Sequence, residues 1–525
     1  MLTSIGVLLL LVLVGCHHTH VAMGSFNGNF TDQLSLLEFK KGISDPKQAL
    51  MSWNDSTHFC SWEGVLCSVK HPDRVTSLNL TRRGLVGEIS PSLGNLTFLK
   101  VLLLNLNSFS GEIPPSLGQL HRLQILKLDY NTLQGVIPSL ANCSNLKELW
   151  LRNNQLTGPI PIDIPHALEK LVLSLNNLTG TIPTSLANIT TLSVLDVAFN
   201  SIEGNIPNEF EKLSALQFLF MGRNKLSGYC FPQPILNLSV LVRFSVAYND
   251  LRGDVPSYIG NSLPNLEIFE LDNNFFHGHI PSSLTNASKL TLIDISSNRF
   301  AGVVPRSIGK LSRLYSLNLD SNKLLTRNMQ DWEFIDSLAN CTELQEFSIT
   351  ENHLEGNVPY SIGNLSRQLQ ILYMADNHLS GVFPSGLANL RNLINVGLSM
   401  NRFVGVLPEW IGTLTNVQVV LLSNNFFSGA IPSSFSNMSQ LEELDLDFNR
   451  FDGQIPQALG NLQMLRFLNI PNNNLHGSIP KELFRISTIV QIILSSNNLD
   501  GTLHDDIGNA KQLTYLHISS NNISG

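Results

Sequence analysis

The chain has 525 residues, of which 43% are hydrophobic and 14% are charged, and its formal net charge is −8. The mildly acidic net charge and the lack of a basic cluster along the sequence argue against nucleic-acid binding. Length alone would suggest about three or four globular domains. An internal repeat that begins near residue 75 instead predicts one repeat domain from there onward.

The first 24 residues have the pattern of a secretory signal peptide. The apolar run from Ile5 to Val14 is too short to span a bilayer, and the small residues Ala22 and Gly24 follow it at A-x-G spacing. We therefore expect cleavage near Gly24. Residues 13–16 also fit a bacterial lipoprotein cleavage box, which is the alternative.

Residues 25–73 are predicted to form an N-terminal cap. Helical spacing begins at Asp32 and is broken at Asp45-Pro46, which predicts one or two helices. A solenoid exposes the core of its first coil, and such a cap would cover it. The apolar side of the cap helix is expected to carry Leu34, Leu37, Phe39 and Ile43.

Cysteines close the cap and recur further along the chain. In a secreted chain Cys60 and Cys67 predict a disulfide, because no second cysteine pair exists to complete a zinc site. Cys143, Cys230 and Cys341 are expected to be buried and unpaired. We predict no metal site and no cofactor.

Residues 74–525 are built from one repeated template, L-x-L-x-x-N-x-L-x-G-x-I-P. The period is clearest in its asparagine column, which we call the ladder asparagines: Asn107, Asn131, Asn154, Asn176, Asn200, Asn224, Asn249, Asn274, Asn298, Asn322, Asn352, Asn377, Asn401, Asn425, Asn449, Asn473, Asn497 and Asn521. The steps are 22 to 25 residues except for one of 30, which is the period of a leucine-rich-repeat solenoid. Arg83 holds the same column in an irregular first coil, which gives about nineteen coils with an incomplete last one.

Each template position has a structural role. Alternating leucines predict a short strand with one inward face, and coils stacked about 4.8 Å apart pair these strands into a long parallel sheet. An asparagine that points into the core must have its amide satisfied by backbone groups of the turn, so the column is architecture and not catalysis. Glycine permits a backbone conformation that other residues resist, and Ile-Pro sets an extended segment before a helical outer turn. We therefore predict an α/β repeat solenoid, a curved right-handed superhelix with a concave parallel β-sheet.

The coil of 30 residues carries extra residues from Arg327 to Phe334, including Trp332. We expect them to form a bulge of the outer turn, because an island that binds a ligand would usually be longer.

The cap and the coils together resemble a known family. The similarity lies in the cap residues from Asp32 to Trp53, in C-x-W-x-G-V-x-C from Cys60 to Cys67, and in L-x-G-x-I-P coils such as 84–96. They are similar to the extracellular part of plant leucine-rich-repeat receptor-like kinases, in the grass-like subfamily that contains innate-immune and rice blight-resistance receptors. This resemblance implies an ectodomain that senses a ligand, often a peptide, and pairs with a leucine-rich-repeat co-receptor kinase.

The sequence departs from that family in what it lacks. It has no Gly-rich phosphate loop, no H-R-D or D-F-G motif, and no apolar run of ~18 residues. We therefore expect this chain not to be an enzyme, although the parent family carries a Ser/Thr kinase. It would be truncated before the transmembrane and kinase segments, and would reach a membrane only through that missing C-terminal segment.

Thirteen N-x-S/T sequons support secretion. Eight of them fall at one phase of the repeat and are predicted to carry glycans on one outer flank: Asn95, Asn142, Asn188, Asn237, Asn286, Asn340, Asn364 and Asn437. Glycans there would leave the concave sheet open for protein binding. The alternative is that N-L-T and N-C-S only satisfy the local turn consensus.

Function is expected at the variable strand positions, because the fixed positions only build the coil. Residues six, four and two before each ladder asparagine should face the concave solvent side, with the residue just before it near the rim. Aromatic and basic residues fill these positions first and an acidic stretch follows, as expected for protein-binding anchors, although a long surface also scatters some aromatics. The candidate ligand-binding residues are Tyr130, Trp150, Arg152, Phe199, Phe218, Phe220, Arg223, Arg243, Tyr248, Glu270, Asp272, Asp294, Asp320 and Tyr373.

We therefore expect a secreted or cell-surface ectodomain that binds a peptide or protein ligand and signals through a co-receptor, in defence or development. The alternative is a secreted decoy, or an inhibitor of cell-wall-degrading enzymes similar to polygalacturonase-inhibiting proteins. An enzyme is not expected, because the histidines and carboxylates are dispersed without a nucleophile–base pair.

Overall fold

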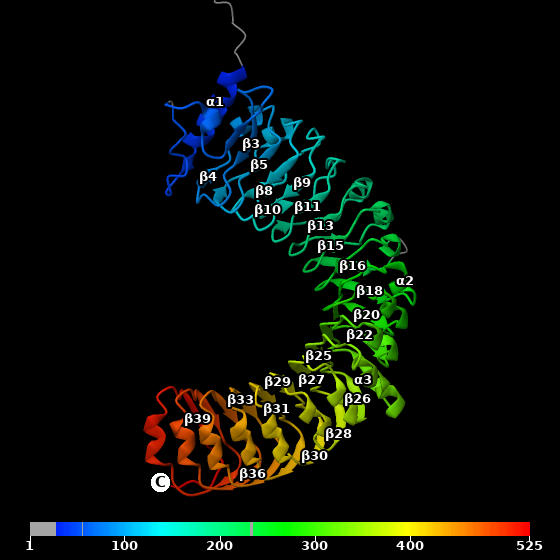
Figure 1. Ribbon diagram of the computed structural model, residues 1–525, viewed down its shortest axis with the longest axis vertical. Coiled ribbons are helices and arrows are strands. Elements are labelled where there is room, and N and C mark those ends of the chain that lie inside the picture. Colours follow the sequence, from blue (N-terminus) through cyan, green and yellow to red (C-terminus); the bar gives the residue numbers. More distant parts are fainter. Residues whose placement is uncertain (1–27, 55, 232–234, 525) are drawn as a thin grey trace, which may run out of the picture.

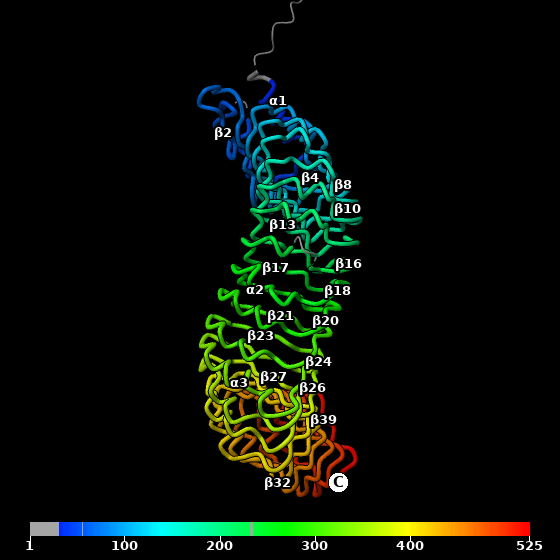
Figure 2. Tube along the Cα trace, turned by 90° about the vertical axis from the view of Figure 1, so that its right-hand side faces the viewer, coloured from blue at the N-terminus to red at the C-terminus, as the bar shows by residue number. Residues whose placement is uncertain are grey.

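The computed structural model describes residues 28–54, 56–231 and 235–524, so the predicted signal peptide lies outside the described residues. The chain forms a single curved solenoid (Figure 1). A turned view shows the coils stacked one after another along its length (Figure 2). The predicted repeat solenoid is confirmed.

One strand from each coil joins a long sheet, the concave sheet. Neighbouring coils pair in parallel and in register, with Leu171 opposite Leu195 and Leu195 opposite Leu219. In the C-terminal half, Figure 1 shows β25, β27 and β29 on the inner side of the arc. The sheet begins with β2 (Val65–Cys67), which is antiparallel to β3 (Val75–Asn79). It continues through β5 (Val101–Leu103), β7 (Ile125–Lys127), β9 (Glu148–Trp150), β11 (Lys170–Val172), β13 (Val194–Asp196), β15 (Phe218–Phe220), β17 (Arg243–Ser245), β19 (Ile268–Glu270), β21 (Leu292–Asp294), β23 (Ser316–Asn318), β25 (Glu346–Ser348), β27 (Ile371–Tyr373), β29 (Asn395–Gly397), β31 (Val419–Leu421), β33 (Glu443–Asp445), β35 (Phe467–Asn469), β37 (Gln491–Ile493) and β39 (Tyr515–His517).

A second set of strands, which the sequence did not predict, follows the ladder asparagines. It forms three segments, and single bridges, Glu112 with Gln134 and Thr181 with Glu203, connect one segment to the next. The first two segments are β1 (Ile43–Ser44), β4 (Val86–Glu88) and β6 (Ser108–Ser110), then β8 (Gln134–Val136), β10 (Gln155–Gly158) and β12 (Asn177–Leu178). The third, which we call the long flank sheet, consists of β14 (Glu203–Gly204), β16 (Lys225–Tyr229), β18 (Asp250–Asp254), β20 (Phe275–Gly278), β22 (Arg299–Gly302), β24 (Lys323–Thr326), β26 (His353–Asn357), β28 (His378–Gly381), β30 (Arg402–Val406), β32 (Phe426–Gly429), β34 (Arg450–Gly453), β36 (Asn474–Gly477) and β38 (Asn498–Leu499).

The outer turns are short helices, as predicted. Most begin directly after a proline whose extended backbone sets the start, as at Pro281 before η7. They are η2 (Pro91–Asn95), η3 (Pro115–Gln119), η4 (Thr184–Asn188), η5 (Asn208–Lys212), η6 (Ile235–Asn237), α2 (Ile259–Ser262), η7 (Ser282–Asn286), η8 (Arg306–Lys310), η9 (Met329–Trp332), α3 (Glu333–Leu338), η10 (Tyr360–Asn364), η11 (Ser385–Asn389), η12 (Glu409–Thr413), η13 (Ser433–Asn437), η14 (Gln457–Asn461), η15 (Lys481–Arg485) and η16 (Asp505–Asn509).

The extra residues of the 30-residue coil lie in the outer turn, as expected, but part of them is buried. They fold into η9 and α3, and the rings of Trp332 and Phe334 are buried and stacked 5.9 Å apart. The indole Nε1 of Trp332 donates to the carbonyl of Glu355, at 3.3 Å. Burial of these large apolar side chains therefore packs this part of the insertion onto the core, while residues 327–330 stay exposed.

The ladder asparagines make the predicted hydrogen bonds. The side-chain amide of Asn298 donates to the carbonyls of Leu271, Ile295 and Ser296, at 2.9, 3.3 and 2.9 Å. Its Oδ1 accepts from the backbone N–H of Phe276, at 2.9 Å. Each buried asparagine thus joins its own turn to the preceding coil.

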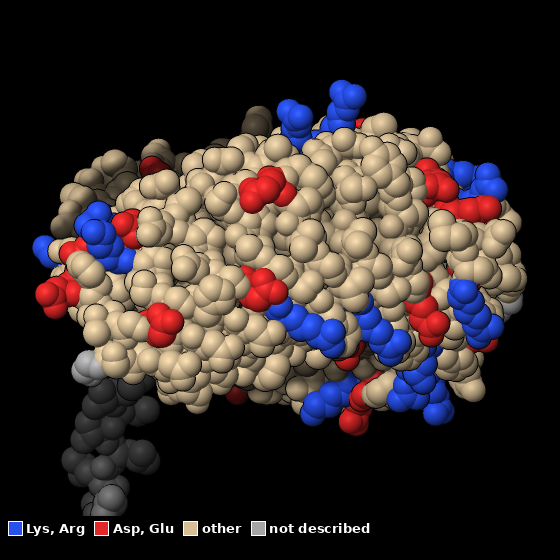
Figure 3. All heavy atoms as spheres, turned by 90° about the horizontal axis from the view of Figure 1, so that it is seen from below, with Lys and Arg blue, Asp and Glu red and all other residues tan. Residues whose placement is uncertain are grey.

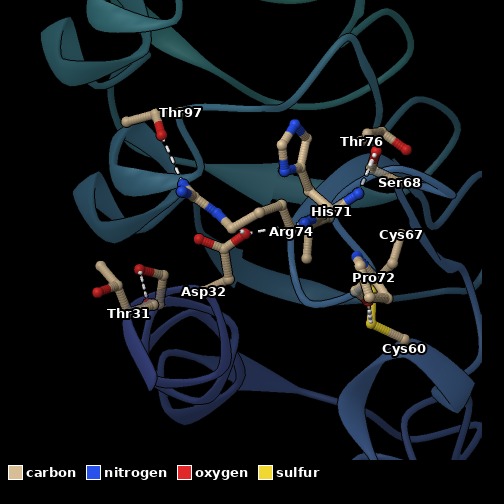
Figure 4. Close-up of polar contacts among 12 residues, drawn as sticks. Thr31, Asp32, Cys60, Cys67, Ser68, His71, Pro72, Arg74, Thr76 and Thr97 are labelled. Atoms are coloured by element: carbon tan, nitrogen blue, oxygen red, sulfur yellow. Dashed lines mark hydrogen bonds and ion pairs between the residues drawn. A yellow bond between two sulfur atoms is a disulfide. The ribbon is translucent and has the colours of Figure 1, made fainter. Parts of the chain in front are cut away.

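The cap consists of α1 (Gly28–Lys41) and η1 (Phe59–Ser61). The predicted apolar side was wrong at Leu34, which is 54% exposed, whereas Leu36 and Phe39 are fully buried beside Asp32. Figure 4 shows the Asp32 carboxylate beside the side chain of Arg74, whose Nε donates to it at 3.3 Å. The N–H of Val75 also donates to this carboxylate, at 2.8 Å, which explains why it occupies the buried face. Burial raises the pKa of Asp32, and these two donors oppose that rise.

The cysteines behave as predicted. Cys60 and Cys67 form a disulfide with their Cα atoms 5.6 Å apart. Cys143, Cys230 and Cys341 are free and buried. Burial raises the pKa of all three thiols, to about 11 for Cys143 and about 12 for Cys341, so they are packing residues and not nucleophiles.

Candidate functional site on the concave face

The concave sheet brings most of the predicted binding residues together, and none of the fourteen is buried. A hollow of about 470 Å³ lies over β9 to β21, and we call it the concave hollow. Eight of the predicted residues line it: Arg152, Phe199, Phe220, Arg223, Tyr248, Glu270, Asp272 and Asp294.

One wall of the concave hollow is aromatic and basic. The guanidinium carbon of Arg223 lies 3.9 Å from the ring centre of Tyr248 and 5.2 Å from that of Phe199. Each of these three residues directly precedes a ladder asparagine and has a positive φ between 53° and 55°. This stacked group therefore presents flat faces and one positive charge to a ligand.

The floor contains a polar group that the sequence did not single out. Asp196 accepts from the hydroxyl of Ser174 at 2.6 Å and from the N–H of Ala198 at 3.2 Å. Burial raises the pKa of Asp196. Ser174 and Asp196 occupy the same alternating strand positions as the predicted residues, so the strand pattern also predicts that they face the concave side. They were not among the candidates because their side chains are small.

Arg152 adds an unused donor to this floor. Its Nε is buried and has no hydrogen-bond partner among the described residues. A buried donor without a partner costs free energy that an acceptor from a bound molecule would recover.

The part of the concave hollow that follows along the sheet is acidic. Burial, followed by the negative charges of Asp294 and Glu270, raises the pKa of Asp272 to about 6. Asp294 accepts from the hydroxyl of Ser296 at 2.7 Å and from the amide of Asn318 at 3.1 Å. The basic and aromatic residues and the acidic residues thus lie on successive coils of the same hollow.

The structure places the other six candidates outside the hollow: Tyr130, Trp150, Phe218, Arg243, Asp320 and Tyr373. Asp320 accepts from the hydroxyl of Ser348 and the N–H of Thr350, both at 2.6 Å, and so stabilises the neighbouring coil. Its pKa is raised by burial.

Several of these six have intramolecular partners. Lys127 Nζ lies 4.5 Å from the ring centre of Trp150, and Arg243 lies 5.8 Å from that of Phe218. The fourteen candidates therefore form one central cluster with outliers on both sides.

The eight predicted glycosylation sites are all exposed. Six of them are the last residue of a 3₁₀ helix on the outer turns: Asn95, Asn188, Asn237, Asn286, Asn364 and Asn437. Their common position places them away from the concave hollow, and their glycosylation remains a prediction.

Sequence comparisons agree with this architecture. The leucine rich repeat N-terminal domain family matches residues 31–68, and leucine rich repeat families match 98–120, 145–167, 166–226, 264–324, 368–390 and 391–475. Among solved structures, the plant peptide hormone receptor RGFR1 in complex with RGF2 is 32% identical with a TM-score of 0.78, over 89% of this chain and 80% of that one. This chain belongs to the family of plant leucine-rich-repeat receptor ectodomains.

Other members of the plant leucine-rich-repeat receptor family are similar over different lengths. The ectodomain of the Arabidopsis receptor kinase HAESA, solved with the peptide hormone IDA and the co-receptor SERK1, is 29% identical with a TM-score of 0.65, over 94% of both chains. The receptor-like serine/threonine-protein kinase EFR of Arabidopsis thaliana is 51% identical over 83 residues, which is 15% of this chain and only 8% of that relative. In the part of the chain that the structure describes, no helix is long and apolar enough to cross a membrane.

Proposed function

We propose that this chain is the ligand-recognition ectodomain of a plant leucine-rich-repeat receptor-like protein or kinase, and that it binds an extended peptide or a protein segment on its concave face. One observation carries the proposal. The concave hollow juxtaposes the Phe199–Arg223–Tyr248 stack with the carboxylates of Asp272 and Asp294.

That arrangement can hold a peptide in one direction. An acidic or carboxylate-bearing group would lie against Arg152 and Arg223, and a basic side chain against Asp272 and Asp294. The charges set polarity, and the aromatic faces supply most of the affinity. The peptide complexes of RGFR1 and HAESA support a ligand of this class.

The proposed output is pairing with a co-receptor kinase at the cell surface. The assembly of HAESA with IDA and SERK1 supports this part of the proposal. We propose that this output serves defence or development, as the family resemblance of the sequence implies.

The test begins with a library of displayed random peptides panned on the secreted ectodomain. Enriched peptides are titrated onto the wild type and onto the double variant Phe218→Ala, Phe220→Ala, whose rings share one face of β15. The double variant should lose at least ~2 kcal/mol of binding free energy. Asn237→Gln with Asn286→Gln is the control and should change glycosylation but not binding.

Hydrogen exchange with and without an enriched peptide tests the location. Protection should appear in β9 to β21. Protection confined to the outer 3₁₀ turns, with the strands unchanged, would contradict a concave binding face.

A further inference from the structure

The long flank sheet carries a row of side chains that the concave site does not use. Eight consecutive strands, β20 to β34, each begin at the residue after a ladder asparagine. In every case that first residue is aromatic, basic or histidine, and we call the set the basic–aromatic column: Phe275, Arg299, Lys323, His353, His378, Arg402, Phe426 and Arg450. The strands that follow, β36 and β38, begin with Asn474 and Asn498, so the pattern is local.

The column is exposed along its length, with only His378 partly covered. Its members stack on one another. Arg299 lies 4.8 Å from the ring centre of Phe275, Arg450 lies 4.7 Å from that of Phe426, and the rings of the two histidines are stacked 6.1 Å apart.

The four cations of the column are not neutralised within the molecule. None of Arg299, Lys323, Arg402 and Arg450 forms an ion pair with any described residue. Two carboxylates, Glu355 and Asp452, lie further along the same strands. A chain of net charge −8 thus keeps a positive strip on one flank.

Figure 3 agrees with an uneven charge distribution. Most Lys and Arg side chains of the face that it shows lie in a band toward its lower edge and right-hand end, with Asp and Glu side chains among them, and much of the remaining surface is uncharged. The eight predicted glycosylation sites lie on the outer turns and not on the strands of the column, so glycans would leave the column free.

We propose that the basic–aromatic column binds an extended acidic polysaccharide, a polyuronate. Successive coils repeat every ~4.8 Å, so eight of them offer a track of about 34 Å that follows the curve of the solenoid. The Arg and Lys side chains pair with carboxylates, while the Phe and His rings provide flat faces for the apolar sides of sugar rings.

Charge density selects this occupant over a nucleic acid. The track carries four permanent cations over its whole length. Duplex DNA presents a negative charge about every 1.7 Å and is bound by denser basic surfaces. Along the track the order is Phe, Arg, Lys, His, His, Arg, Phe, Arg, so cations are interspersed with rings. A polymer whose carboxylates are borne on flat sugar rings fits such a mixed track.

The experiment titrates polygalacturonate oligomers onto the ectodomain at low and moderate salt. The wild type should bind, and the affinity should fall as salt rises. The variant Arg299→Gln, Lys323→Gln, Arg402→Gln, Arg450→Gln should lose at least about tenfold in affinity. Phe275→Ala with Phe426→Ala should also weaken binding, which simple charge attraction does not predict.

A matched control removes four exposed cations that form no ion pair with any residue the structure describes and that lie on the outer turns: Lys212→Gln, Lys310→Gln, Lys481→Gln and Lys511→Gln. It has the same net charge as the column variant and should bind polygalacturonate like the wild type. Equal losses in both variants would overturn the column as the site.

Two further probes test the class of ligand. Fully methyl-esterified polygalacturonate, which lacks the charges, should not bind. Binding of single-stranded DNA or polyglutamate as tightly as polygalacturonate would overturn the polysaccharide assignment. The concave double variant Phe218→Ala, Phe220→Ala should leave polygalacturonate binding unchanged, so this site and the proposed peptide site can fail separately.

Discussion

The residue before each ladder position adopts a left-handed backbone conformation throughout the solenoid. Nineteen such residues have φ between 46° and 60°, and none of them is glycine. None is valine, isoleucine or threonine either, although these nineteen residues include large ones such as Leu106, Phe199, Arg223 and Met400. From the sequence we predicted that this position lies near the rim of the sheet, but we did not predict its backbone conformation. The absence of β-branched residues at this position is the feature of the sequence that indicates it.

Met400 isolates the cost of this conformation, because its side chain is 52% exposed and contributes little to the core. Met400→Val should destabilise the protein by about 1–2 kcal/mol, since a β-branched residue resists positive φ. Met400→Asn should be neutral or slightly stabilising. Thermal melts of the two variants measure this, and equal melting temperatures would contradict it.

Asn298 tests the ladder itself. Asn298→Ala should cost about 1–3 kcal/mol, because it leaves buried backbone groups of two coils without partners. The control is Asn474→Ala, which removes an exposed asparagine one residue after a ladder position. Denaturant unfolding of both variants should separate them clearly, and a wild-type midpoint for Asn298→Ala would show that the ladder is not needed.

Asp272 should make stability depend on pH. Its pKa in the folded protein is raised to about 6 from 3.8, so the folded state keeps a proton that the unfolded state releases. Stability contributed by Asp272 is therefore present at low pH and is lost as the pH rises from about 4 to about 6. Asp272→Asn should melt like the wild type at pH 4 and higher than the wild type at pH 7. A difference that is larger at pH 4 would contradict the assignment.

At the scale of elements, the repeated strands and outer turns could be predicted from the sequence, and parts of the cap and of the insertion could not. Leucines that alternate with period 2 and the Ile-Pro pairs favour their local structure within a single coil, so the sequence of each coil predicts its own strand and turn. Asp32 lies on the buried face of α1 because of donors 42 and 43 residues away, at Arg74 and Val75, which no local pattern contains. The burial of Trp332 likewise depends on a later coil, through Glu355.

The disulfide of the cap should act locally. Cys60→Ser with Cys67→Ser removes a link across 7 residues and should cost on the order of 2 kcal/mol by the loop-entropy account. Hydrogen exchange should quicken in α1 and β2 before it changes in β33 or β35, because each coil contacts only its neighbours. Uniform quickening across the solenoid would contradict this.

At the scale of the whole molecule, the candidate site could be predicted in its position but not in its shape. Strand alternation predicts that the fourteen candidates share one face, and none of them is buried. It could not show that curvature gathers Arg152 and Asp294 into one hollow, or that Asp196 completes its floor. The basic–aromatic column was missed because the strands after the ladder asparagines were not predicted.

Because each coil contacts only its neighbours, the distance between two substitutions along the solenoid should determine whether their effects on the free energy of unfolding are additive. Asn176→Ala and Asn449→Ala lie far apart and share no hydrogen-bond partner, so their destabilising effects should add to within ~0.5 kcal/mol. Asn298 and Asn322 both donate to the carbonyl of Ile295, so Asn298→Ala with Asn322→Ala should depart from additivity. Urea unfolding of the single and double variants gives both values. Perfect additivity in the neighbouring pair would show that the shared carbonyl does not couple them.

The flanking strands are interrupted between β12 and β14, and this interruption should affect how stiff the solenoid is. The concave sheet passes this point without a break, but the flanking strands are joined there by a single bridge, between Thr181 and Glu203, and by the hydrogen bond from the N–H of Ser201 to the carbonyl of Leu178. Bending resistance should therefore drop at this joint, and the arch should flex there more easily than within the long flank sheet. Arg152 precedes the joint and Asp272 follows it, so an occupant touching both would brace the arch and fix the angle between its two arms.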